Sequence, residues 1–344
     1  MRTLLLILLL TALSPGAMQA AVIDVYTGEA AVENNGESER VRALPLALKN
    51  ALQKMSGFRT FDDYPLVEPA LSNAPSILLS FYYRNVETVL PDGSSNDELR
   101  LVARFSAEKV NELARTLQLP LWPAERQSID FWIVVDNGLD RRVMPVEFAY
   151  VWQTLSDLAE WRGLPVTWPE VDENGQYAID TQLLWGGYTE DLPAGPHSAA
   201  MISAVRREGP EWNVRSNLTY SGESWTWKVK DIDIQAAMTE SLQQAVDLIA
   251  AANTIAASDL GATVHQLTVN GIRNSDDYTR CLAYLQQLGV VSEVSVVSAQ
   301  PGNVTFSLEL NALPRYLEDA LLSGRFLGFD ETRNSWSLRT GSHD

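Results

Sequence analysis

The chain has 344 residues, of which 46% are hydrophobic and 20% charged, so it is long enough for two or three globular domains and is not of the disordered class. Its formal net charge of −18 at pH 7 argues against nucleic-acid binding, because that function needs a basic face that neutralises phosphates. The same charge disfavours attachment to an anionic membrane surface.

The first twenty residues have the pattern of an export signal. Arg2 precedes a run of apolar residues, and a Ser-Pro-Gly break leads to small residues that end at Ala20, the order found in cleavable secretory signals. The run is shorter than the roughly 20 residues that a membrane-spanning helix needs, so we expect cleavage near Ala20 and no stable membrane insertion afterwards. The single cysteine, Cys281, permits neither an intramolecular disulfide nor a lipid anchor near the cleavage point. These features predict a periplasmic protein.

Residues 21–120 are predicted to form a small α+β domain. The periodicity indicates, in order, a strand over 22–32, a helix over 40–56 closed by Gly57, a hairpin of strands over 83–90 and 99–106, and a helix that begins after Ser106. Pro45 is tolerated only if it lies near the start of its helix. Pro120 and Pro123 break the last helix, so we place the first domain boundary there.

Residues 121–258 are predicted to form a second domain around a deeply buried strand. Residues 128–136 hold five large apolar side chains in a row, and the segments that follow complete a strand-helix-strand unit of the parallel type. After a polar loop, the pattern predicts a strand with the sequence LLWGGY. The remaining predictions for this domain are a helix over 146–163, a strand over 164–168, antiparallel strands over 198–206, 211–220 and 224–230, and a helix over 234–258.

Residues 262–340 carry the clearest pattern in the chain. Strands and helices alternate in the order βαββαβ, with the last strand near residues 336–339, and this order is that of a ferredoxin-like domain. The whole chain is therefore predicted to be of the α+β or α/β class, with three small mixed domains of which the last is ferredoxin-like.

The sequence shows no recognisable catalytic, cofactor-binding or metal site. Ser106 and Lys109 match an S-x-x-K pattern, but its companion motifs are missing, so we interpret Ser106 as a helix cap. The three histidines, at positions 197, 265 and 343, are widely separated and follow no triad order. Residues 170–175 resemble the start of a calcium loop, but the twelfth position is Thr181 where an acid is required. We therefore expect no cofactor and no metal, and a non-enzymatic role.

The aromatic residues are the remaining signal. Nine of the ten tryptophans fall within residues 121–258. Trp225 and Trp227 share one face of a strand that either a helix of the same domain or a partner must cover, and we expect the helix to cover it. The segment Trp185-Gly186-Gly187-Tyr188 is the candidate partner-binding site. Adjacent glycines let another backbone approach closely, and aromatic residues are enriched at interfaces.

Several packing motifs carry a family resemblance. The stretches ALPLALKNALQKMSG, DFWIVVD, LLWGGY and VNGIRNSDDYTRCLAYLQQL together resemble the uncharacterised DUF2066 family of exported proteobacterial proteins. The resemblance implies export and architecture but no catalytic residue. The middle domain is also similar in its predicted element order to the N-terminal domain of the Tol-system periplasmic propeller protein and of related envelope lipoproteins, which implies docking onto other envelope proteins.

Three functional hypotheses follow. The first is a soluble periplasmic adaptor or scaffold that binds envelope proteins. The second is an envelope hydrolase or carbohydrate-active enzyme that uses a pair of carboxylates. The third is a small-ligand sensor that uses the C-terminal domain, whose sheet could also pair with that of a second copy.

Overall fold

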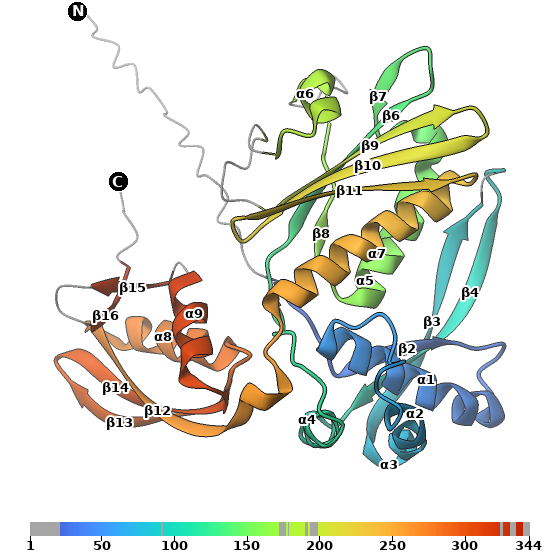
Figure 1. The fold of residues 1–344 in the computed structure, drawn as a ribbon. Helices are drawn as coiled ribbons and strands as arrows, with labels where there is room; N and C mark the ends of the chain where they lie inside the picture. The colour runs from blue at the N-terminus through green and yellow to red at the C-terminus, as the bar shows by residue number, and fades with distance from the viewer. Residues whose placement is uncertain are drawn as a thin grey trace, which may run out of the picture.

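The computed structural model describes residues 21–90, 92–171, 177, 179–189, 192, 199–323, 326–330 and 335–339. Within these residues the strands form four open sheets of mixed order, and the predicted α+β class is confirmed. Figure 1 shows the three larger sheets in three lobes that follow one another along the chain. The expected signal peptide lies outside the described residues. None of the helices described is both long and apolar enough to cross a membrane.

The N-terminal lobe is a three-stranded antiparallel sheet with the order β2-β4-β3 and a long helix, α1, across one face. The apolar side chains of α1 recur at helical spacing and are buried against the sheet. A Cβ at Gly28 would lie 1.8 Å from the carbonyl oxygen of Ala47, so only glycine lets α1 approach the strand so closely. The elements are β1 (Ala21–Val22), β2 (Thr27–Ala31), α1 (Glu37–Ser56), α2 (Val67–Ala70), α3 (Ala74–Ile77), β3 (Leu78–Val89), β4 (Ser95–Phe105), α4 (Ala107–Thr116) and β5 (Glu125–Arg126).

Helix α1 differs from the prediction at its start. It begins at Glu37, so Pro45 lies in the helix interior and not in the first turn. The proline removes one backbone hydrogen bond. Leu44 and Leu48, which flank it on the buried face, are at most 4% exposed. Burial of this apolar stripe holds the helix together across the proline, because most helix stability in a protein comes from packing.

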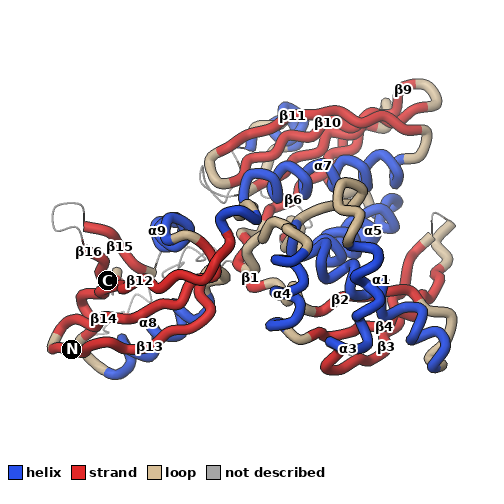
Figure 2. The backbone as a smooth tube through the Cα atoms, turned by 60° about the horizontal axis from the view of Figure 1, so that its bottom comes forward, coloured by secondary structure: helices blue, strands red, loops and turns tan. Residues whose placement is uncertain are grey.

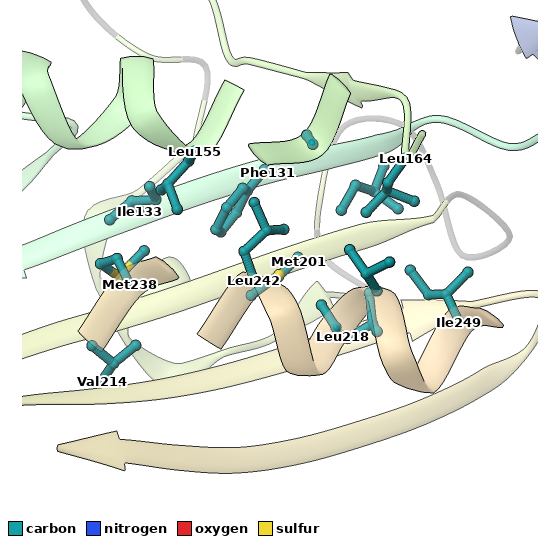
Figure 3. Packing of buried hydrophobic residues seen from close by; sticks show 14 of the residues in the cluster. Phe131, Ile133, Leu155, Leu164, Met201, Val214, Leu218, Met238, Leu242 and Ile249 are labelled. Carbon is teal, nitrogen blue, oxygen red and sulfur yellow. The ribbon is translucent and has the colours of Figure 1, made fainter. Parts of the chain in front are cut away.

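The middle lobe is built on a sheet with the order β11-β10-β9-β6-β7, and β8 also pairs with β6. Strand β6 is the predicted buried strand, and it runs parallel to β8 and β9. Helices α5 and α7 cover one face of this sheet, and Figure 3 shows Phe131, Leu155 and Leu242 packing between the two layers. The elements are β6 (Ile129–Asp136), β7 (Arg141–Val143), α5 (Ala149–Arg162), β8 (Val166–Thr167), α6 (Thr181–Gly186), β9 (Ala200–Glu208), β10 (Glu211–Tyr220), β11 (Glu223–Asp231) and α7 (Ile234–Asn253).

The segment LLWGGY was predicted as a strand, and this prediction was wrong. Residues Thr181–Gly186 form the helix α6. The Asp180 side chain accepts a hydrogen bond of 2.7 Å from the backbone N–H of Gln182, and Gly187, with φ of +83°, closes the other end in the left-handed conformation. These two caps favour a helical turn over an extended strand.

The C-terminal lobe has the predicted βαββαβ order with one further strand. Strand β16 corresponds to the predicted last strand, and it lies parallel to β12, between β12 and the additional strand β15. The sheet order is β13-β14-β12-β16-β15. Helices α8 and α9 contribute buried residues to its core. The elements are β12 (Leu260–Ile272), α8 (Ser275–Gln287), β13 (Val291–Gln300), β14 (Gly302–Ala312), α9 (Pro314–Ser323), β15 (Leu327–Asp330) and β16 (Ser335–Leu338).

Buried and partly buried polar contacts join the lobes, which lie side by side in the tube view of Figure 2. Arg162, at the end of α5, donates 2.9 Å to the carbonyl oxygen of Gly57 in the N-terminal lobe and 2.8 Å to Asp247 on α7. The carboxylate of Glu125 accepts a hydrogen bond of 2.7 Å from the backbone N–H of Gly289 in the C-terminal lobe. Burial raises the pKa of Glu125 above its ordinary value. These directional contacts fix how the lobes meet.

Candidate functional site

The candidate segment lies on the face of the middle sheet opposite to α5 and α7 (Figure 1). Leu184 of α6 is fully buried and packs with Trp132, Val134 and Ile202, which point outward from β6 and β9. This small apolar cluster anchors the helix, because burial of each large apolar side chain stabilises the contact by about 1.5–3 kcal/mol. The segment is therefore a fixed surface feature of the sheet.

Trp185 packs against two arginines that share one carboxylate. The guanidinium carbons of Arg141 and Arg206 lie 4.3 and 5.1 Å from the centre of a ring of Trp185, within cation–π range. Asp136 Oδ2 accepts hydrogen bonds of 3.1 Å from Arg141 Nε and 3.0 Å from Arg206 Nη2. Because the backbone N–H of Gly138 and both guanidinium groups stabilise the charged carboxylate, the pKa of Asp136 falls to about 2.

The two glycines of the segment leave space that other side chains of the same chain fill. A Cβ at Gly186 would lie 2.2 Å from the ring of Tyr188, and one at Gly187 would lie 2.5 Å from Asn217 Oδ1. The space expected for an incoming backbone is thus occupied by side chains of the same chain. The exposed surface of this region is apolar and aromatic: Tyr188 is 50% exposed and Leu183 is 38% exposed.

Polar side chains of strand β10 lie against α6 and the glycine that follows it. Arg215 Nη2 donates to the carbonyl oxygen of Trp185, while its Nε is buried without a hydrogen-bond partner. Asn217 donates 3.0 Å to Thr226 Oγ1, and its Oδ1 is also buried and unpartnered. No sequence pattern assigned Arg141, Arg206 or Arg215 to the candidate site. The alternation of strands β9 and β10 places Arg206 and Arg215 on the outer face, but it does not show that Trp185 packs against Arg141 and Arg206.

The other sequence candidates have structural roles or fall outside the description. Ser106 is the N-cap of α4, as predicted, and Lys109 Nζ binds Glu112 at 2.9 Å. His265 lies in β12, whereas His197, His343 and most of the calcium-like stretch are outside the described residues. Cys281 is fully buried, and burial raises its pKa to about 12. Among the described residues, no group of three or more His, Cys, Asp or Glu side chains is placed to hold a metal ion.

Comparison with known proteins gives a family of unknown function for the first lobe. Residues 20–123 match the family described as "Domain of unknown function (DUF8605)". No curated protein matches the chain. A solved structure titled "Crystal structure of uncharacterized protein" is similar with a TM-score of 0.16 and 11% identity over 36% of this chain and 87% of that one. At that TM-score the likeness carries no argument. The chain thus contains a domain of unknown function.

Proposed function

We propose that this protein is a periplasmic adaptor or scaffold that works by binding other proteins of the cell envelope. The export pattern of its first residues and the resemblance to the exported DUF2066 family support the location. We take the mature chain as three domains, over residues 21–120, 121–258 and 262–340. The similarity of the middle domain to the N-terminal domain of the Tol-system propeller protein supports a docking role, and the docking surface proposed for it is the segment from Trp185 to Tyr188.

The observation that carries this proposal is that the exposed ring of Tyr188 directly follows a helix anchored in the sheet. The ring packs over Gly186, Leu184 anchors the helix in the sheet, and Trp185 packs against Arg141 and Arg206. A binding surface that is already ordered loses little conformational entropy when a partner binds. Tyrosine is among the residues most enriched where interfaces gain their binding energy.

The experiment is crosslinking in living cells from a photoreactive amino acid at position 188. We expect one envelope protein to be recovered at reproducible stoichiometry. The matched control carries the same amino acid at Tyr82, which is 60% exposed and lies on β3 of the N-terminal lobe. The same spectrum of products from positions 188 and 82, or no product from position 188, would contradict the proposal.

Substitution gives a second readout. Tyr188→Ala removes a half-exposed ring, so we expect it to weaken partner recovery at least about tenfold while lowering the free energy of unfolding by only about 1 kcal/mol. Tyr82→Ala is the control and should leave recovery unchanged. If Tyr188→Ala and Trp185→Ala both keep every interaction intact, the segment is not the docking surface.

A further inference from the structure

Strand β11 is one edge of the middle sheet. Its pairing partner is β10, and no strand of the described residues lies on its other side. The turn between them has two central residues, Ser221 and Gly222, with φ of +50° and +84°, as in the two-residue hairpins of type I′. In such a hairpin the pair next to the turn, here Tyr220 and Glu223, is hydrogen-bonded.

This register decides which backbone groups face outward. Hydrogen-bonded and non-hydrogen-bonded pairs alternate along an antiparallel ladder, so Trp225, Trp227 and Val229 bond to β10. The N–H and C=O groups of Thr226, Lys228 and Lys230 then point to the open edge of the sheet. The edge offers a row of donors and acceptors of the kind that pairs with an added strand.

A groove runs beside this edge. It has a volume of about 420 Å³ and lies between β11 and α7, lined by Trp225, Thr226 and Trp227 from the strand and by Gln244, Asp247, Leu248 and Ala251 from the helix. Both tryptophans are half-buried on the face toward α7, and Trp227 Nε1 donates 3.1 Å to Ser241 Oγ. The groove is therefore a mainly apolar slot next to unpaired backbone groups. An edge strand beside such a slot is an arrangement by which proteins bind extended peptides.

The charge around the edge favours a bound segment that carries acidic side chains. Lys228 and Lys230 are exposed on the face away from α7, and no acidic side chain of the described residues forms an ion pair with either of them. Arg215 faces Lys228 directly across the ladder, which makes this face positive in a chain of net charge −18. The acid in the groove, Asp247, is already paired with Arg162 at 2.8 Å.

We propose that the β11 edge and its groove bind an extended segment of another polypeptide as an added strand. Side chains alternate between the two faces of a strand. Apolar side chains of the segment would enter the groove toward α7, and acidic side chains would face Lys228 and Lys230 on the other face. A second copy of β11 is a poor occupant, because it would set these lysines against their own counterparts. This surface is separate from the one around Tyr188.

The test uses a displayed library of random nine-residue peptides selected against the mature protein. We expect enrichment of sequences in which apolar residues alternate with Asp or Glu. The affinity of a representative peptide should fall with salt, because exposed charge pairs are screened. Lys228→Gln should weaken it about twofold to fivefold.

Comparison of Lys228→Pro with Lys228→Gln separates backbone pairing from charge, because both variants lose the ammonium group and only the proline variant also loses the backbone N–H. Lys228→Pro removes an outward N–H while leaving the ladder to β10 intact, and proline is tolerated at such edge positions. Ala251→Phe fills the groove from an exposed position on α7. Each should reduce affinity about tenfold or more, with far-ultraviolet circular dichroism unchanged. Ala251→Phe keeps the test valid if the proline variant fails to fold.

Several results would overturn the proposal. One is a selection with no enrichment, or with enriched peptides that lack acidic residues. Another is binding that both Lys228→Pro and Ala251→Phe leave intact. A stable dimer that Lys228→Pro dissociates would show that a second copy takes the edge. Peptides whose binding is lost in Tyr188→Ala but not in these variants would exclude this groove while supporting the surface around Tyr188.

Discussion

Arg126 donates a hydrogen bond of 2.6 Å from Nη1 to the carbonyl oxygen of Gly163, which closes helix α5. The same buried guanidinium donates to the carbonyl oxygens of Lys54, Trp122 and Pro123 and lies over the ring of Trp122. Burial lowers the pKa of Arg126 to about 9. One side chain therefore ties the end of α1, the linker between the first two lobes, and the end of α5.

Arg126→Met should destabilise the protein strongly. Methionine fills similar space but donates nothing, and each buried carbonyl left without a donor costs about 1–3 kcal/mol. We expect the free energy of unfolding to fall by at least about 3 kcal/mol, measured by urea denaturation. Arg115→Met removes an exposed arginine on α4 and serves as the control, with an expected change within about 0.5 kcal/mol. Equal losses in the two variants would mean that Arg126 does not hold the lobes.

Gly28→Ala should force α1 away from β2. The new Cβ would meet the carbonyl oxygen of Ala47, and backbone cannot move aside without shifting the whole helix. We expect a loss of about 1–3 kcal/mol or more in unfolding free energy. The control is Gly261→Ala, where a Cβ has nothing within 4 Å and the backbone is not left-handed. A stable Gly28→Ala variant would show that this contact is not tight.

Asp136→Asn should lower stability in a pH-dependent way. The folded pKa of about 2 is below the ordinary value of 3.8, so the carboxylate stabilises the fold fully above pH 3.8 and loses this effect as the pH falls through 2. At pH 6 we expect a loss of about 1–3 kcal/mol relative to the unchanged protein. The difference should shrink between pH 4 and 2 in thermal unfolding series. A difference independent of pH would rule out the carboxylate charge as its cause.

Cys281 should be unreactive in the folded protein. With the pKa raised to about 12, almost no thiolate is present at pH 8, and the side chain is fully buried. We expect no reaction with a thiol reagent over hours under native conditions and one equivalent in denaturant. Rapid labelling of the folded protein would place Cys281 at an accessible surface.

Sequence periodicity was sufficient for most of the fold. The apolar run in β6, the cap at Ser106 and the βαββαβ order of the last lobe are local patterns, and each was predicted correctly. Intramolecular cover of Trp225 and Trp227 was also confirmed, because both pack in the cluster shared with α7. The exceptions include the start of α1 and the elements α6 and β15. The last two are short, and a short apolar run does not distinguish a helix from a strand.

For the candidate site, the sequence supplied the aromatic residues and the tertiary structure supplied their setting. The exposed ring of Tyr188 belongs to a segment visible in the sequence, whereas Arg141 and Arg206 reach Trp185 from strands β7 and β9. The edge of β11 and its groove likewise depend on which strand is last in the sheet and on where α7 crosses it. Hydrophobic spacing along the chain determines the helices and strands, because it acts between near neighbours. Contacts between residues tens of positions apart depend on how those elements pack, and these contacts decide which polar groups are paired, buried or left open.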